Sequence, residues 1–484
     1  MWHGHPFGYV QDKLGRVFTG FKPVPLIEHR VLLEKTMVNK NPKLVDIAKP
    51  NLYRDMFPYT DFPAVVFDGK RVEYDIPEQI WITDTTFRDG QQARPPYTPE
   101  QILRIYDLLH KIDGGTGLIR QCEFFLYSER DREAVELCKE RNYDYPEVTG
   151  WIRAVAADFK LVSQMGLTET GILASASDYH IFLKLRKTRA QAMKGYLDIA
   201  KAALESGVIP RCHFEDITRA DYDGFVLPFA ADLMKLAEQY DKPVKIRLCD
   251  TLGFGIPWSG VTLPRSVPKL IHGLRKIGVP SEWLEWHGHN DFHKVQINAA
   301  TAWLYGCCAA NTSIFGNGER TGNPPLEALV VEHAQIKGIS EGVNYAAITE
   351  LAEYARKELG VEIPRNYPLV GRDFNVTRAG IHADGLLKNE EIYNCFDTQK
   401  LLNRPIGVAI TDKTGAAGIK HWIEARFEIQ IPKHDPRVTK IKDQIDAEYA
   451  ADRVSSISDE EMFEWVRIVF GSDIPKEKTD SSLL

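Results

Sequence analysis

Short apolar runs rich in β-formers alternate with longer amphipathic runs along most of this chain, and that alternation restricts the fold more than any other feature. Eight such β-rich runs occur, at residues 79–86, 118–125, 149–154, 168–177, 208–216, 244–251, 281–290 and 308–316. The stretches between them, such as 99–112 and 189–207, place apolar side chains at helical spacing. Eight strands and intervening helices over roughly 260 residues predict a (β/α)₈ barrel. A doubly wound open sheet is the alternative, because local pattern does not reveal closure.

The sequence differs in character on either side of this region. Residues 1–78 are rich in proline, aromatic and basic residues, which predicts an N-terminal extension that packs on the barrel or on a partner subunit. The barrel is expected to span 79–345. Residues 346–484 begin with a helical pattern, continue through a Gly-rich segment at 378–418, and end in a charged tail that favours helix at 433–470. We therefore expect mainly helical C-terminal subdomains.

Composition excludes several classes of protein. The formal net charge is −7, so a nucleic-acid or anionic-membrane partner is not expected. The seven cysteines are irregularly spaced, with no CxxC pair, which favours a reducing compartment over a disulfide framework or a zinc ribbon. The chain has no apolar stretch long enough to span a bilayer and no signal-peptide core at its start, so we expect a cytoplasmic protein.

Two histidines stand two residues apart at the end of the seventh expected strand, in "LEWHGHNDF". Side chains two apart on a strand point the same way, so His287 and His289 present both imidazoles on one face. The carboxyl ends of barrel strands carry active sites, and Asp89 follows the first strand at the same rim. One carboxylate and two imidazoles suit a divalent metal ion. Two structural histidines at a strand end are the alternative.

Two more features lie at this rim. Arg88, beside Asp89, could neutralise an anion near the metal, although a surface salt bridge is the usual role of an arginine in a loop. The segment 315–330 follows the eighth strand, and its Asn323 could supply an oxygen to the same ion. By itself this segment is also consistent with a simple turn before a helix. Three loops from one rim together favour the metal site.

The three motifs in this order resemble those of the DRE-TIM metallolyase superfamily. They are "DTTFRDGQQ" at 84–92, "HGHND" at 287–291 and "GNGERTGN" at 316–323. The similarity runs from about residue 80 to 425 and is greatest to the Claisen-condensing branch, which contains isopropylmalate, homocitrate, citramalate and Re-type citrate synthases. The resemblance implies a barrel enzyme that transfers an acyl group from acetyl-CoA to a 2-oxo acid with the help of a divalent metal.

The resemblance also implies roles for individual residues. Asp89, His287 and His289 would bind the metal, with Asn323 nearby, and Arg88 would polarise the keto oxygen of the 2-oxo acid. Positions that would bind the substrate are Gln92, Arg153, His180 and Thr251. Positions implied to be catalytic besides Arg88 are Glu215, His382 and Tyr393. His382 and Tyr393 belong to a segment that reaches a partner subunit's active site in these synthases, which implies a homodimer.

The chain departs from the family pattern in places. Gln91 stands where a glutamate is common, and on the second strand a family glutamate is expected to be replaced by Gln121, with Glu123 two residues on. The length after the barrel leaves no room for the leucine-sensing domain of typical isopropylmalate synthases, which disfavours isopropylmalate formation.

Within the branch we favour oxaloacetate as acceptor, giving citrate by the Re-face route. The segments most similar to that subgroup are 123–127, 303–306 and 371–394. Homocitrate synthesis from 2-oxoglutarate is the second hypothesis, and isopropylmalate or citramalate synthesis the third. An HMG-CoA-lyase activity is disfavoured because the loop 316–323 has no cysteine. A non-catalytic 2-oxo-acid sensor is the hypothesis from another class. Mn²⁺ is the metal we favour, with Mg²⁺, Co²⁺ or Zn²⁺ as alternatives.

Overall fold

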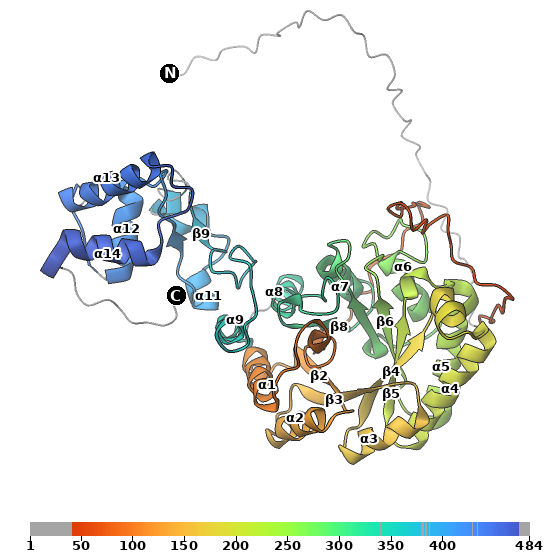
Figure 1. Cartoon of the computed structure of the whole chain (residues 1–484). Coiled ribbons are helices and arrows are strands. Elements are labelled where there is room, and N and C mark those ends of the chain that lie inside the picture. The colour runs from red at the N-terminus through yellow and green to blue at the C-terminus, as the bar shows by residue number, and fades with distance from the viewer. Residues whose placement is uncertain are drawn as a thin grey trace, which may run out of the picture. The chain divides into compact units, whose positions relative to one another are not determined.

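Eight parallel strands close into a barrel in the computed structural model, which describes residues 41–338, 341–378, 382, 385–386, 388–427, 429–432 and 434–473. The strands follow one another around the barrel in chain order, and the last pairs with the first (Figure 1). They are β1 (Trp81–Asp84), β2 (Ile119–Phe125), β3 (Glu147–Ile152), β4 (Glu169–Ser175), β5 (Ile209–Glu215), β6 (Lys245–Asp250), β7 (Leu284–Gly288) and β8 (Ala309–Thr312). The predicted (β/α)₈ barrel is therefore confirmed, with strand ends that differ from the expected ones by a few residues.

One α-helix follows each strand. These helices are α1 (Pro99–Asp113), α2 (Glu129–Glu140), α3 (Phe159–Gln164), α4 (Arg189–Glu205), α5 (Leu227–Tyr240), α6 (Val267–Lys276), α7 (Val295–Leu304) and α8 (Leu326–Lys337). Capping residues in the sequence mark where helices begin. In α1 the Thr98 hydroxyl accepts from the Gln101 backbone N–H, and the Gln101 side chain accepts from the Thr98 N–H, which is a capping box. Gly114 ends the same helix in the left-handed conformation, φ +62°.

Alternation along the strands separates an apolar outer layer from a polar interior. In β7, Leu284 and Trp286 are completely buried in the main hydrophobic core, whereas Glu285 and His287 face the barrel interior. In β5, Phe214 stacks on Phe229 of α5 with ring centroids 4.9 Å apart. Burial of these outward-facing side chains between strands and helices holds the barrel together, and the interior is left to charged and hydrogen-bonding groups.

Residues 41–78 run along the barrel surface without regular secondary structure. They are fastened by polar contacts at several points: Val45 N–H donates to Gly224 O at 2.9 Å, and the Lys269 ammonium pairs with Asp68 at 2.6 Å. This part of the predicted extension therefore contacts the barrel, and residues 1–40 lie outside the described residues.

The chain after the barrel is mainly helical. Its elements are α9 (Ala346–Glu358), β9 (Val376–Thr377), α11 (Thr398–Leu402), β10 (Gly407–Val408), α12 (Ala416–Phe427), α13 (Pro436–Ala450) and α14 (Asp459–Phe470). Helix α9 contributes to the same hydrophobic core as the barrel, whereas α12, α13 and α14 share a second core of their own. The division of the chain at residues 78 and 345 stays a prediction. Among the described residues, no helix is both long enough and apolar enough to cross a bilayer.

Candidate active site

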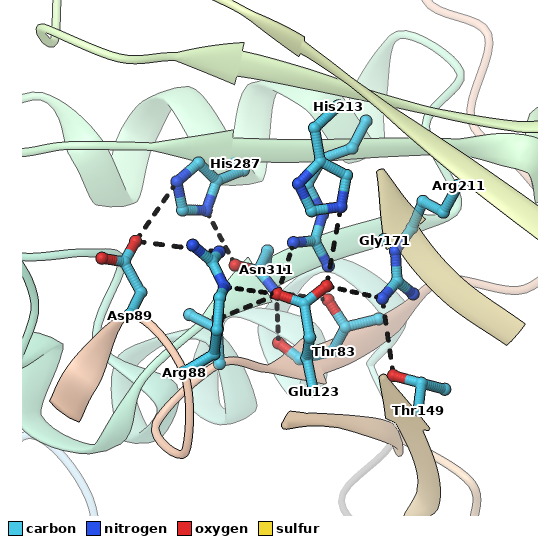
Figure 2. A network of polar contacts seen from close by, with 12 residues as sticks. Thr83, Arg88, Asp89, Glu123, Thr149, Gly171, Arg211, His213, His287 and Asn311 are labelled. Carbon is cyan, nitrogen blue, oxygen red and sulfur yellow. Dashed lines mark hydrogen bonds and ion pairs between the residues drawn. The ribbon is translucent and has the colours of Figure 1, made fainter. Parts of the chain in front are cut away.

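Three side chains from opposite ends of the barrel sequence meet at the carboxyl ends of the strands. Asp89 lies in the turn after β1, His287 is on β7, and His289 directly follows that strand. The Nε2 atoms of His287 and His289 lie 3.4 and 3.6 Å from the same oxygen, Asp89 Oδ2, and all three side chains are buried. The structure thus brings together the three residues expected to bind a metal (Figure 2 shows Asp89 and His287).

These distances fit ligands of one ion better than direct hydrogen bonds. Hydrogen bonds from ring N–H groups to carboxylates are typically about 2.7–3.2 Å long. Ligand atoms that each lie about 2.1 Å from a shared cation are roughly 3.0–3.4 Å apart in octahedral or tetrahedral geometry. A carboxylate with two imidazole nitrogens is also a donor set that divalent ions of this type accept. The residues present therefore fit a divalent metal.

Electrostatics keeps these groups in the protonation states that metal binding requires. Burial lowers the pKa of His287 and of His289, an effect that nearby Asp89 only partly opposes, so both imidazoles are neutral at neutral pH. Burial alone would raise the pKa of Asp89, but the charge of Arg88, the two neighbouring imidazoles and the hydrogen bond from Asn323 outweigh it, and the pKa lies below its usual value. Asp89 is accordingly a carboxylate.

Asn323 lies against the same carboxylate. Its Nδ2 donates to Asp89 Oδ2 at 3.2 Å and to the Gly288 carbonyl at 3.3 Å, while its Oδ1 is buried and makes no hydrogen bond to the described residues. A buried acceptor without a partner is unusual, and it is consistent with an oxygen that can turn toward a cation. The amide oxygen lies close to Gly318, because a Cβ at Gly318 would be 1.8 Å from Asn323 Oδ1.

The turn after β1 points Arg88 and Asp89 inward. The Asp84 carboxylate accepts from both the backbone N–H and the hydroxyl of Thr86 at 2.9 Å, which closes the turn. Gln91, the residue that departs from the family pattern, donates to the Phe87 carbonyl and accepts from the Tyr97 N–H. Its side chain therefore braces the turn.

Arg88 forms an ion pair with a carboxylate on β2. Its Nε lies 2.6 Å from Glu123 Oε2, and its guanidinium lies 3.9 Å from Asp89 Oδ2 (Figure 2). Gln121, two residues earlier, lies deeper and hydrogen-bonds Glu169 at 3.2 Å. Of the two second-strand residues considered from the sequence, it is therefore Glu123 that contacts the site, and the surface salt bridge considered for Arg88 is instead a buried pair.

A second polar cluster lies where β4, β5 and β6 end. His180 Nδ1 lies 2.8 Å from Glu215 Oε2, and Lys184 lies 3.1 Å from Glu215 Oε1. Burial would raise the pKa of Glu215, but its hydrogen bond with His180 and the charge of that ring lower it to about 2. The Thr251 hydroxyl accepts from the Asp216 N–H at 2.8 Å. Three residues expected near the substrate, His180, Glu215 and Thr251, thus occupy one side of the rim.

The remaining expected residues are more exposed. Arg153 follows β3, pairs with Asp158 at 2.9 Å, and has a side chain that is 64% exposed. Gln92 is exposed in the turn after β1. His382 and Tyr393 lie next to each other with ring centroids 4.3 Å apart, and both are exposed. No contact within the part of the chain that the structure describes joins these two rings to Asp89.

The charged barrel interior beneath the site was not predicted from the sequence. Its members are Thr83, Glu169, Arg211, Arg247, Glu285 and Asn311, and all are buried. They belong to six different strands, so their pairing is invisible in any local window. A signal did exist, since charged residues inside strands otherwise buried on both faces are rare unless they are paired.

A parallel barrel whose rim gathers a carboxylate, two neutral imidazoles and an arginine defines a class of enzyme that activates a small oxygen-rich substrate on a divalent ion. Within that class, the model of the HMGL-like family matches residues 79–354, and the chain belongs to this family.

Several relatives are similar over most of the chain. The protein named Citrate (Re)-synthase from Clostridium kluyveri is 54% identical over 425 residues, which cover 87% of this chain and 94% of that protein. The Citrate (Re)-synthase from Syntrophus aciditrophicus is 53% identical over 90% of this chain and 71% of its own length. The 2-phosphinomethylmalate synthase from Streptomyces hygroscopicus is 39% identical over 88% of this chain and 98% of its own length.

Proposed function

We propose that this chain is a metal-dependent synthase that joins the methyl carbon of acetyl-CoA to the keto carbon of oxaloacetate and releases CoA, giving citrate in the Re-type stereochemical course. The observation that carries the proposal is the convergence of Asp89, His287 and His289 beside Arg88 at the barrel rim. The choice of oxaloacetate is supported by the two relatives named Citrate (Re)-synthase, at 54% and 53% identity.

The ligands in this proposal are Asp89, His287 and His289, with Asn323 beside them, and Mn²⁺ is the metal we favour over Mg²⁺, Co²⁺ or Zn²⁺. A divalent ion bound there would withdraw electrons from the keto group of the 2-oxo acid and so make its carbon electrophilic. Arg88 supplies a second positive charge where the keto oxygen becomes negative. Because Glu123 holds its guanidinium at 2.6 Å, that charge needs little reorganisation during the reaction.

The reaction needs a base and an acid in addition to these charges. The acetyl methyl group loses a proton to a positioned base, the resulting carbon attacks the keto carbon, and the keto oxygen takes up a proton. Water then cleaves the thioester, which yields the tricarboxylate and CoA. We assign acid–base work to Glu215, His382 and Tyr393. The low pKa of Glu215 leaves it ionised at neutral pH, so its carboxylate can polarise His180.

Substrate carboxylates are assigned to groups at the same rim. Thr251 and His180 lie on one side of it, and Arg153 and Gln92 offer exposed polar groups on the β3 and β1 sides. Arg153 is only partly covered by Asp158, so it remains available to a dicarboxylate longer than oxaloacetate. For that reason 2-oxoglutarate, giving homocitrate, is the second candidate acceptor.

We further propose a cytoplasmic homodimer in which the segment bearing His382 and Tyr393 completes the neighbouring subunit's site. Exposure of both rings beside each other supports this assignment, because a side chain that works in a partner's site must be accessible in its own subunit. All seven cysteines are free thiols, as expected for a reducing compartment.

The test is CoA release from acetyl-CoA with Mn²⁺ and a panel of oxaloacetate, 2-oxoglutarate, pyruvate and 2-oxoisovalerate. We expect the highest kcat/KM with oxaloacetate, and no release by Asp89→Ala under the same conditions. Highest kcat/KM with 2-oxoglutarate would establish the second candidate, and activity with 2-oxoisovalerate or pyruvate alone would refute both. No thiol release with any acceptor, together with measurable 2-oxo-acid binding, would identify a sensor. Citrate made from ¹⁴C-labelled acetyl-CoA and cleaved by a stereospecific lyase reports the face of attack.

A further inference from the structure

A buried chain of hydrogen bonds begins at the metal-facing histidine and runs away from the site into the barrel. His287 Nδ1 lies 2.8 Å from Asn311 Oδ1, and Asn311 Nδ2 donates to the Thr83 hydroxyl at 2.8 Å (Figure 2). The Thr83 hydroxyl in turn donates to Glu285. Strand register favours this chain, because Thr83 of β1 is paired with Asn311 of β8.

The direction of every hydrogen bond in this chain follows from its far end. The Glu285 carboxylate accepts from the Arg247 guanidinium at 2.9 Å and lies 3.4 Å from Arg211, so the groups beside it are ones that can only donate. A carboxylate accepts only, so the Thr83 hydroxyl must donate to it and can only accept from Asn311. Asn311 therefore turns its Nδ2 toward Thr83 and its Oδ1 toward His287.

The protonation of His287, at the other end of these hydrogen bonds, then has only one possibility. Because Asn311 Oδ1 is an acceptor, His287 must carry its proton on Nδ1, and the lone pair of Nε2 faces Asp89 and the metal position. If the Asn311 amide were reversed, Nδ1 would have to accept, the proton would move to Nε2, and the ring could not bind a cation.

The same carboxylate connects to the other half of the site. Glu285 lies 2.9 Å from Arg247, Arg247 lies 2.9 Å from Glu123, and Glu123 holds Arg88 at 2.6 Å. All of these side chains are at least 90% buried. The metal-facing ring and the arginine beside it are thus positioned from one buried anion.

We propose that Thr83 and Asn311 are positioning residues for the metal centre: anchored on Glu285, they fix the tautomer and the ring orientation of His287. Neither residue touches the metal position or the substrate in this assignment. The inference takes from the proposed function only that Asp89, His287 and His289 are ligands, and it holds for any acceptor that the enzyme uses.

The test measures Mn²⁺ affinity of the full-length, metal-free protein by calorimetric titration without substrate. Thr83→Val removes one hydroxyl and keeps the shape of the side chain, so the hydrogen bond that orients Asn311 is lost. We expect the Kd for Mn²⁺ to rise by roughly 10–100-fold, the range found when groups that orient a metal ligand are removed. Thr83→Ser keeps the hydroxyl and should stay within about threefold of the unmodified protein.

Thr170→Val is the matched control. Thr170 is a fully buried barrel threonine on β4 whose hydroxyl makes one hydrogen bond among the described residues, to the Gly171 carbonyl at 3.4 Å. This variant loses a hydroxyl from the same barrel, so it should lower the thermal midpoint without changing the Kd for Mn²⁺. If Thr83→Val does not fold, Asn311→Leu, which has a similar shape and offers no acceptor, provides the same reading.

The outcomes separate the inference from the proposed function. If Thr83→Val, or Asn311→Leu in its place, binds Mn²⁺ within threefold of the unmodified protein, the positioning role is wrong. A weakened Thr83→Val that Thr83→Ser does not restore, or an equally weakened Thr170→Val, would also overturn it. Asp89→Ala with undiminished Mn²⁺ binding would instead overturn the ligand assignment, and loss of thiol release with normal metal affinity would bear only on the proposed reaction.

Discussion

Removing the charge of Glu123 tests whether the buried arginines of the barrel interior depend on this carboxylate for charge compensation. Its two oxygens lie 2.6 Å from Arg88, 2.9 Å from Arg247 and 2.7 Å from Arg211, and the side chain is 2% exposed. Burial would raise its pKa, but the three guanidinium groups, Arg247 first among them, hold the pKa well below its usual value. Glu123→Gln keeps the volume of the side chain and leaves three buried cations short of one anion.

The expected cost follows from the burial of these groups. Breaking a buried ion pair by removing one partner typically costs about 3–5 kcal/mol, because the remaining charge stays desolvated. A loss of about 1 kcal/mol lowers the thermal midpoint by about 2–4 °C in chains of roughly 150–250 residues, so the expected decrease is about 6–20 °C. For a longer chain we expect a decrease in the lower half of that range. The assay measures the thermal midpoint of the metal-free protein by scanning calorimetry at one fixed scan rate.

Glu350→Gln is the matched control, because it breaks an equally short ion pair at the surface. Lys111 and Glu350 lie 2.5 Å apart with side chains 48% and 45% exposed. Exposed pairs contribute roughly 0–1 kcal/mol, so the thermal midpoint should move by no more than about 4 °C. A Glu123→Gln midpoint within the shift of this control would show that the interior arginines find other partners or water, and it would refute the reasoning.

Three further predictions concern the site. Gly318→Ala should raise the Kd for Mn²⁺ by at least about tenfold, because the new Cβ displaces Asn323 Oδ1. Gly415→Ala, where a Cβ meets nothing within 4 Å, should leave the Kd unchanged, and equal Kd values for the two variants would contradict the packing argument. The unfolding free energy of the metal-free protein should fall as pH decreases below about 6.5, because His287 takes up a proton in the unfolded chain but stays neutral when it is buried in the fold. Thermal midpoints between about pH 7.5 and 5 measure this fall, and His287→Gln should reduce the dependence of the midpoint on pH. Mixing inactive His287→Ala and His382→Ala subunits, unfolded and refolded together, should restore thiol release if His382 works in the partner's site; no recovery in confirmed mixed dimers would refute that arrangement.

The sequence predicted the barrel because each strand and helix is encoded locally. Alternation of apolar residues and helix caps such as Thr98 with Gln101 can be read within a few residues. The convergence of Asp89 with the two histidines could also be anticipated, because every strand of a closed parallel barrel delivers its carboxyl end to one rim. Closure itself joins β1 to β8 and has no local signal.

The interior could not be predicted in the same way. Glu285 meets Thr83, which lies 202 positions earlier in the chain, and Glu123 meets Arg247 across 124 positions. Which carboxylate neutralises which guanidinium depends on strand stagger, and the sequence does not reveal that stagger. For the same reason the sequence left the roles of Gln121 and Glu123 open, although they point the same way from one strand.

The position of the metal tests the central claim most directly. Crystals of the full chain grown with Mn²⁺ and measured at a wavelength where manganese scatters anomalously report it without any assumption about activity. We expect one strong peak within roughly 2.0–2.6 Å of an Asp89 oxygen and of both His287 Nε2 and His289 Nε2. A strong peak elsewhere, with these three side chains bound only to one another, would contradict the account.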